Sequence, residues 1–257
     1  MKTTEICGRA QQFRRELEET KRELAPSAFG WYPYGTLNNF TILERLLSKS
    51  GRNLLELIDG LPIADIGAAD GDTAFFMESL GLEADVIDYP PTNFNGCRGV
   101  RLLKEARQSG IGIHEVDLDA HFDLPRERYG LAFFLGILYH LKNPFGALEN
   151  LSRRARHALI STRVMRYNTP PPKLFGRSSS PERVALHNVP VAYLVGPYET
   201  NGDPTNYWMF SEAGLLRILD RTGWDVLDHI SVGNTSESDP ATDAGDERAF
   251  CLVRSRH

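Results

Sequence analysis

The stretch Leu61-Pro-Ile-Ala-Asp65-Ile-Gly67-Ala-Ala-Asp70-Gly71 decides the fold of this 257-residue chain. It is an apolar strand, Pro62 to Ile66, that runs into a glycine-containing turn and then into a helix from Thr73 to Leu80. Glycines let the backbone of such a turn approach a ligand closely, and the helix start offers unpaired N–H groups. The stretch therefore predicts a strand-turn-helix unit that binds a small molecule at its turn.

A carboxylate at the end of the next strand indicates which class of ligand the turn binds. The apolar run Ala84-Asp85-Val86-Ile87 ends in Asp88, which Tyr89 follows. An acid at this place can accept hydrogen bonds from the two hydroxyls of a ribose. We therefore expect Asp88 and Tyr89 to contact a nucleotide-like cofactor.

The glycine spacing favours one cofactor over another. A dinucleotide-binding turn has the pattern G-x-G-x-x-G, whereas Gly67 and Gly71 give G-x-x-x-G, preceded by Asp65. An acid in the turn attracts a cationic ligand and repels a pyrophosphate, which disfavours a nicotinamide oxidoreductase. The run Asp65-x-Gly67-x-x-x-Gly71 resembles motif I of class I S-adenosylmethionine (SAM) methyltransferases. This resemblance implies that Asp65, Gly67, Ala68 and Gly71 bind SAM, with S-adenosylhomocysteine (SAH) as the product.

Strands and helices alternate after residue 60, which argues for a parallel sheet wound on both faces. Further strands are expected at 84–88, 111–116, 131–135, 157–162, 224–230 and 249–253, and further helices at 100–108, 145–155 and, capped by Ser211, up to 221. The last two strands have no helix between them and should pair as an antiparallel hairpin. The predicted fold is α/β: a doubly wound, mostly parallel seven-stranded sheet with an antiparallel last strand, as in class I methyltransferases.

Two regions decorate this predicted domain of residues 60–257. Residues 1–59 are expected to form a helical N-terminal lid, with helices at 1–25, 37–49 and 54–58. A Pro- and Gly-rich insertion is expected at about 166–209. Aromatic residues of the two regions could cover an acceptor molecule; they are Trp31, Tyr32, Tyr34, Tyr207 and Trp208.

The carboxyl ends of the other strands supply the remaining site residues. Asp117 is expected to bind the adenine amino group and Leu118 to cover the adenine, although Asp119 and Asp123 compete for the role of Asp117. Gly136 follows the fourth strand. Tyr139 and His140 come next, where the methyl group should lie, and are the candidate catalytic residues: Tyr139 as an aromatic wall and His140 as a base.

A narrower resemblance begins at Tyr139. The run Leu138-Tyr-His-Leu141 before Asn143-Pro144, the segment Asn206-Tyr-Trp-x-Phe-Ser211 and the start of the last strand at Arg248 resemble the wobble-uridine tRNA carboxymethyl transferases. In that family a lysine, a tyrosine and an arginine hold the extra carboxylate of carboxy-SAM. Tyr139 and Arg248 match two of these positions, and the lysine is not evident. Carboxymethyl or methyl transfer to tRNA is therefore an alternative function, and a non-catalytic SAM-binding module is another.

The amino-acid composition indicates which partners and which cellular compartment to expect. The net charge of −5 makes tRNA a less favoured partner than a small or medium-sized acceptor molecule. The three cysteines form no C-x-x-C pair, so no metal site is expected. The longest apolar run, Leu131 to Leu138, is too short to span a bilayer, and the polar N-terminus is unlike a secretory signal. We therefore expect a cytoplasmic protein without a membrane partner; the sequence leaves its oligomeric state open.

Overall fold

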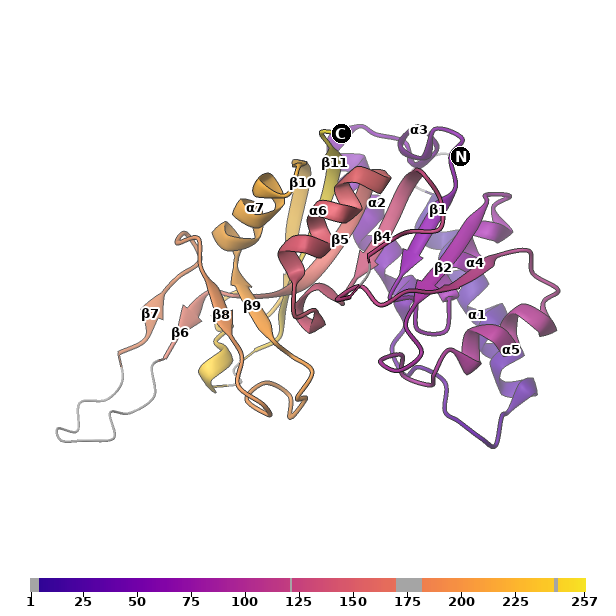
Figure 1. Cartoon of the computed structure of the whole chain (residues 1–257), viewed down its shortest axis with the longest axis horizontal. Helices are drawn as coiled ribbons and strands as arrows, with labels where there is room; N and C mark the ends of the chain where they lie inside the picture. The colour runs from indigo at the N-terminus through magenta and orange to yellow at the C-terminus, as the bar shows by residue number, and fades with distance from the viewer. Residues whose placement is uncertain (1–4, 121, 170–181, 243–244) are drawn as a thin grey trace.

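The central sheet runs in the order β10-β11-β5-β4-β1-β2-β3 (Figure 1). The computed structural model describes residues 5–120, 122–169, 182–242 and 245–257. Strand bounds are β1 Ile63–Ile66, β2 Ala84–Asp88, β3 Gly112–Glu115, β4 Tyr129–Leu135, β5 Ala155–Met165, β10 Trp224–Gly233 and β11 Glu247–Ser255. Neighbouring strands are parallel except at β11, which is antiparallel to β5 and β10. The predicted fold class is confirmed.

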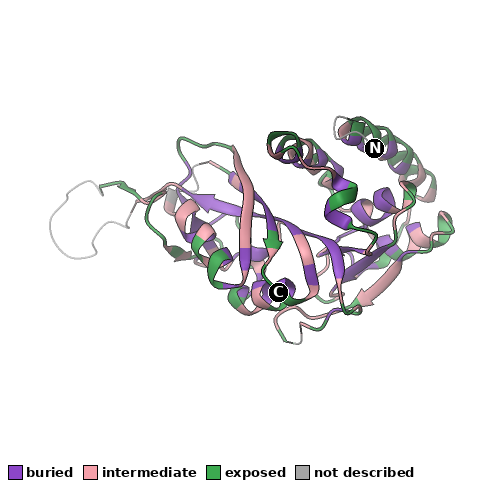
Figure 2. Cartoon of the chain, turned by 90° about the horizontal axis from the view of Figure 1, so that it is seen from above, coloured by how far each residue is buried: buried purple, intermediate pink, exposed green. Residues whose placement is uncertain are grey.

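Helices cover both faces of this sheet (Figure 2). The helices are α1 Ile6–Leu24, α2 Asn39–Ser50, α3 Leu54–Ile58, α4 Asp72–Ser79, α5 Arg98–Ala106, α6 Pro144–Arg154 and α7 Glu212–Arg221. Helices α1 to α5 share one hydrophobic core with sheet residues such as Phe133, and α6 and α7 share another with residues such as Phe134. This split follows from strand geometry, because successive side chains point to opposite faces. None of the described helices is long and apolar enough to cross a membrane.

The N-terminal region packs as part of the main core. On α1 the buried residues Ile6, Ala10, Phe13 and Leu17 recur at helical spacing and form one stripe. The ring centre of Phe76 on α4 lies 5.7 Å from the ring centre of Phe13 and 4.8 Å from that of Phe40 on α2. Each buried side chain of this size stabilises the fold by roughly 1.5–3 kcal/mol. The helices predicted at 1–25, 37–49 and 54–58 are thus present as α1, α2 and α3, with residues 1–4 outside the described part.

The predicted insertion contains short strands that the sequence did not reveal. They are β6 Tyr167–Asn168, β7 Val184–Ala185, β8 Ala192–Leu194 and β9 Trp208–Ser211. Strand β9 pairs in parallel with Val164 and Met165 at the end of β5, and β8 pairs with β9. This pairing extends β5 beyond its predicted end at residue 162. Residues 170–181 of the insertion lie outside the described residues.

The strand order reverses between β1 and β4, since β2 and β3 follow on one side and β5 on the other. Ile66, the last residue of β1, is in register with Ile87 on one side and Phe134 on the other. Both neighbouring strands therefore end within about one residue of the turn that begins at Gly67. In open α/β sheets this switch point is where ligands bind.

Candidate functional site

The turn after β1 requires its glycines. Gly67 and Gly71 have φ angles of +66° and +80°, in a region that favours glycine. A Cβ on Gly67 would overlap the side chain of Ile137, which follows β4. A Cβ on Gly71 would lie 2.8 Å from Val100 of α5. The turn is thus tightly enclosed, and its glycines are needed for both conformation and space.

Asp88 lies against this turn, as the sequence predicts. Its Oδ2 accepts hydrogen bonds from Ala69 N at 3.0 Å and Asn93 Nδ2 at 2.8 Å, and its Oδ1 accepts one from Tyr89 N at 2.7 Å. Burial raises the pKa of Asp88, and these hydrogen bonds oppose the rise. The backbone N–H of Ala68 also acts on this carboxylate, so the turn fixes the position of Asp88. Tyr89 contributes its backbone N–H to this arrangement.

Asp65 is buried beneath the turn. Its Oδ2 accepts a hydrogen bond from Ala74 N, in the first turn of α4, at 3.1 Å. Burial raises the pKa of Asp65 well above its ordinary value, and the nearby acids Asp72 and Asp88 add to the rise. Within the described structure this carboxylate joins β1 to the start of α4. Ala68, in the same turn, is also buried.

The three acids after β3, Asp117, Asp119 and Asp123, bind different partners. Asp119 accepts hydrogen bonds from Lys142 N at 3.1 Å and Asn143 N at 3.0 Å, which anchors the loop before α6. Asp123 pairs with Arg154 at 2.9 Å. Asp117 uses Oδ1 to accept a hydrogen bond from Asp119 N at 3.0 Å. Asp119 and Asp123 thus bind other segments, whereas Asp117 binds within its own loop, and its contact with adenine stays a prediction. Leu118 beside it packs against the core on the α6 side.

A buried cluster of hydrogen bonds around the Asp70 carboxylate, here called the hub, is the main feature that the sequence did not predict. Asp70 Oδ2 accepts hydrogen bonds from Lys21 Nζ at 3.0 Å and Tyr32 N at 2.9 Å, and Oδ1 accepts one from Asn95 Nδ2 at 2.8 Å. Lys21 also pairs with Asp72 at 2.8 Å. The hub ties α1, the aromatic loop at 29–35 and the loop after β2 to the turn. The closeness of Asp65, Asp70 and Asp72 in the sequence is the one signal that could have indicated a buried cation. It does not identify Lys21 as that cation.

Tyr139 and Arg248 lie together over the end of β4. Tyr139 is in the 3-10 helix η3 (Leu138–His140), and the guanidinium carbon of Arg248 lies 5.7 Å from its ring centre. Arg248 Nη1 is 3.5 Å from the place where a Cβ on Gly136 would lie. Gly136 has φ +71°. Burial raises the pKa of the Tyr32 hydroxyl to about 12. The nearby Tyr139 also raises this pKa, and the positive charge of Arg248 lowers it. The aromatic loop therefore reaches the strand ends.

His140 is held in one tautomer. Its Nδ1 lies 3.0 Å from both the carbonyl oxygen and the Oγ1 of Thr205. Thr205 Oγ1 donates its own proton to Asp203 Oδ1 at 2.7 Å, so it can only accept from His140. Nδ1 must therefore carry the proton, which leaves Nε2 as the acceptor. Burial lowers the pKa of His140, so the neutral form dominates at pH 7.

The five predicted lid aromatics lie in different surroundings. Trp31 packs against the core and donates Nε1–H to Lys21 O at 3.0 Å. Tyr34 is 71% exposed beside Tyr32. Tyr207 donates its backbone N–H to Tyr139 O at 2.9 Å, while Trp208 packs against the second core. Tyr32 and Tyr207 are thus the two that the structure brings to the candidate site.

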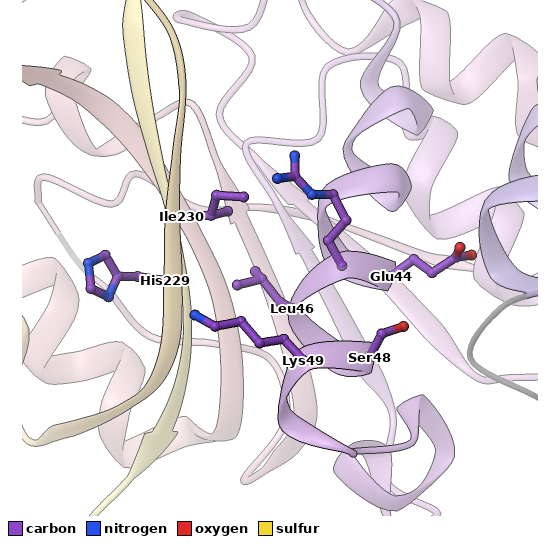
Figure 3. Close-up of a pocket in the computed structure, with 7 residues that line it drawn as sticks. Glu44, Leu46, Ser48, Lys49, His229 and Ile230 are labelled. Carbon is purple, nitrogen blue, oxygen red and sulfur yellow. The ribbon is translucent and has the colours of Figure 1, made fainter. Parts of the chain in front are cut away.

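Two cavities lie outside the strand ends. Figure 3 shows one of about 380 Å³ between α2 and β10, where Lys49, Glu44 and His229 are among the lining residues. Strand β10 is an edge strand, separated from β2 and Asp88 by four other strands. The second cavity, about 360 Å³, lies between α1 and the aromatic loop and borders Lys21 and Asp72. The second cavity therefore adjoins the candidate site.

Comparisons with known proteins agree with the fold. No family model and no curated protein matches this sequence. Among solved structures, the N-terminal domain of EvdMO1 with SAH bound has a TM-score of 0.55 at 15% identity, covering 95% of this chain and 97% of that domain. The chain spans 48% of full-length EvdMO1. The PH0226 protein from Pyrococcus horikoshii has a TM-score of 0.51 at 10% identity, covering 93% and 99% of the two chains.

Proposed function

We propose that this chain is a SAM-dependent methyltransferase that acts on a small or medium-sized acceptor. The observation that carries the proposal is Asp88, held rigidly against the Gly67–Gly71 turn at the switch point of the sheet. The antiparallel β11 supports a methyltransferase over a dinucleotide enzyme. The EvdMO1 domain of similar fold carries SAH, which is in line with this proposal.

The proposed cofactor contacts follow the strand ends. Asp88 and Tyr89 would bind the ribose, and Asp117 and Leu118 the adenine. The turn residues Asp65, Gly67, Ala68 and Gly71, with Gly136, would face the methionine part. Bound SAM supplies an electrophilic methyl group, and its transfer leaves SAH.

Tyr139 and His140 are the proposed catalytic residues. His140 Nε2 would accept the proton of an acceptor O–H or N–H group as the acceptor's lone pair bonds to the methyl carbon. The hydrogen bonds from Nδ1 to Thr205 orient the ring for this step. Tyr139 would present its ring to the sulfonium. Tyr32, reaching the same place from the aromatic loop, would help to exclude water.

Isothermal calorimetry with SAM, SAH, NAD and NADP tests the cofactor. We expect SAM and SAH to bind in the micromolar range, about −7 to −8 kcal/mol. Binding of NAD without any response to SAM or SAH would overturn the proposal. If the protein binds SAM and SAH but forms no SAH from SAM with a broad panel of hydroxyl and amine acceptors, it is instead a non-catalytic SAM-binding module.

Carboxymethyl transfer to tRNA is the second candidate, favoured by the contact of Arg248 with Tyr139. The sequence around Asn38 and Asn39 offers no lysine to match the one that the tRNA family uses. Lys21, which reaches the turn, is engaged by Asp70 and Asp72. We therefore expect SAM to bind at least as well as carboxy-SAM. A strong preference for carboxy-SAM in a competition assay would put the second candidate first.

A further inference from the structure

We propose that Arg163 and Arg248 form a subsite for an anionic group, a carboxylate or a phosphate, carried by the methyl acceptor. This inference rests on the proposed function and names the class of its substrate. Arg163 on β5 and Arg248 on β11 are direct partners in the antiparallel register. Directly opposed residues project from the same face, so both guanidinium groups lie on one side of the sheet.

Within the described residues, both guanidinium groups pair with the carboxylate of Asp246. Arg163 Nε lies 3.1 Å from Asp246 Oδ1, and Arg248 Nε lies 3.5 Å from Asp246 Oδ2. The Arg163 side chain is 5% exposed, and its Nε has no well-aligned hydrogen bond despite the short distance. A buried donor left without an aligned acceptor is costly. The pair therefore has donor capacity beyond what Asp246 uses.

Two further acids near the pair, among the residues that the structure describes, have partners of their own. Asp203 also faces Arg163, but its Oδ1 accepts hydrogen bonds from Thr205 N at 2.9 Å and Thr205 Oγ1 at 2.7 Å. Glu247, next in sequence to Arg248, is held by Arg166 at 2.8 Å. The Arg248 side chain is 34% exposed, so its guanidinium can meet a ligand. Guanidinium groups bind carboxylates and phosphates through paired hydrogen bonds.

The subsite adjoins the proposed catalytic residues. Arg248 lies over Gly136 and Tyr139, and the charges of both arginines act on His140, adding to the effect of burial. An acceptor anchored there by its anionic group would have its nucleophile held beside His140 Nε2. Such anchoring supplies the alignment on which an in-line methyl transfer depends.

Benzoate and benzamide form a matched pair of probes, because they share a ring and differ in charge. Each is titrated calorimetrically into the protein with and without saturating SAH. We expect benzoate to bind at least about tenfold more tightly than benzamide. The ratio of the benzoate affinity to the benzamide affinity should fall close to one in Arg248→Gln. It should be unchanged in Arg254→Gln, an exposed arginine at the far end of the same strand that pairs with Asp225.

A second measurement needs no variant. Phenylglyoxal modifies exposed arginines, and mass mapping of the wild-type protein should show Arg248 protected by benzoate and not by benzamide. Equal binding of the two probes, or a preference that survives in Arg248→Gln, would overturn the subsite. A preference for carboxy-SAM over SAM without one for benzoate would assign the anion to the cofactor and also overturn it. Failure of SAH to bind, by contrast, overturns the proposed function.

Discussion

At the scale of single residues, the acids of the site differ in how much of their hydrogen-bonding capacity the protein uses. Asp119 binds two backbone N–H groups of the loop before α6, and Asp65 binds the start of α4. Asp88 accepts hydrogen bonds from Ala69 N, Tyr89 N and Asn93 Nδ2, and the backbone N–H of Ala68 also acts on it. Its position therefore holds the turn, and the proposed contact with ribose would use the same carboxylate.

Asp88→Asn should lower SAH affinity at least about tenfold, because a charge-assisted bond to ribose is lost. The new amide would also face Ala69 N or Asn93 Nδ2, both donors. The protein without cofactor should therefore lose about 1–3 kcal/mol as well. Asp88 thus has a structural role in addition to the cofactor contact that the sequence predicts. Calorimetry and thermal unfolding measure the two effects, with Asp123→Asn as control; unchanged SAH affinity would leave Asp88 a purely structural role.

The pH dependence of turnover tests His140. Burial lowers the pKa of His140, so Nε2 stays unprotonated until the pH falls below the ordinary histidine value. Activity should hold through pH 6.5 and decline only at lower pH. Thr205→Val removes one acceptor of Nδ1 and should lower kcat more than it raises KM. A decline centred at or above pH 7, or no effect of Thr205→Val on kcat, would argue against this base.

The sequence predicted the residues whose chemistry is local. Gly67 and Gly71 were recognisable because their turn permits little else, and Asp88 because a strand end fixes its place. Asp70 was not, since its partners Lys21, Tyr32 and Asn95 come from three distant segments. Thr205, which orients His140, lies 65 positions away. Long-range pairing of polar groups has no periodic signature in one sequence.

At the scale of elements, a buried lysine of α1 pairs with the start of α4, beside the aromatic contact of the two helices. Lys21 is 11% exposed on its side chain and lies between Asp70 and Asp72. Burial alone would lower the pKa of Lys21, but the carboxylates of Asp72 and Asp70 raise it above its ordinary value. The lysine therefore stays charged throughout the neutral range, and its stabilising contribution is lost only as the pH rises through that raised pKa.

Lys21→Met should reduce the free energy of unfolding by about 3 kcal/mol, because it leaves two acids without their cation. Lys49→Met is the matched control: Lys49 on α2 also pairs with an aspartate, Asp228, at 2.7 Å, but its side chain is 70% exposed. That control should change stability by less than about 1 kcal/mol. Urea unfolding measures both. Equal losses in the two variants would show that the α1 contact is an ordinary surface pair.

The elements that the sequence predicted are those with their own hydrophobic pattern. Strand β2 and helix α3 have the predicted bounds, and the β10–β11 hairpin was recognisable from the absence of a helix between its strands. The short strands of the insertion were not predicted. Strands β6 and β7 have two residues each, too few for alternation to be seen, and β9 forms through pairing with the end of β5.

At the scale of the whole molecule, charge and site geometry favour different partners. The chain carries a net charge of −5, which repels polyanions at long range. The arginine pair at the site is local and half-enclosed, so it can accept one anionic group of a small molecule. A tRNA would need many phosphate contacts spread over a basic surface.

Binding of tRNA should accordingly be weak and without preference for sequence. In a gel-shift series from low to physiological salt, we expect no complex at micromolar protein concentration in the upper part of the range. Because each neutralised phosphate releases counterions, a true tRNA enzyme would bind tightly with a steep salt dependence. Arg153→Gln together with Arg154→Gln tests the two adjacent arginines at the end of α6. If tight, salt-sensitive binding appears and this double variant abolishes it, the acceptor is a nucleic acid held by α6, and the small-acceptor proposal is wrong.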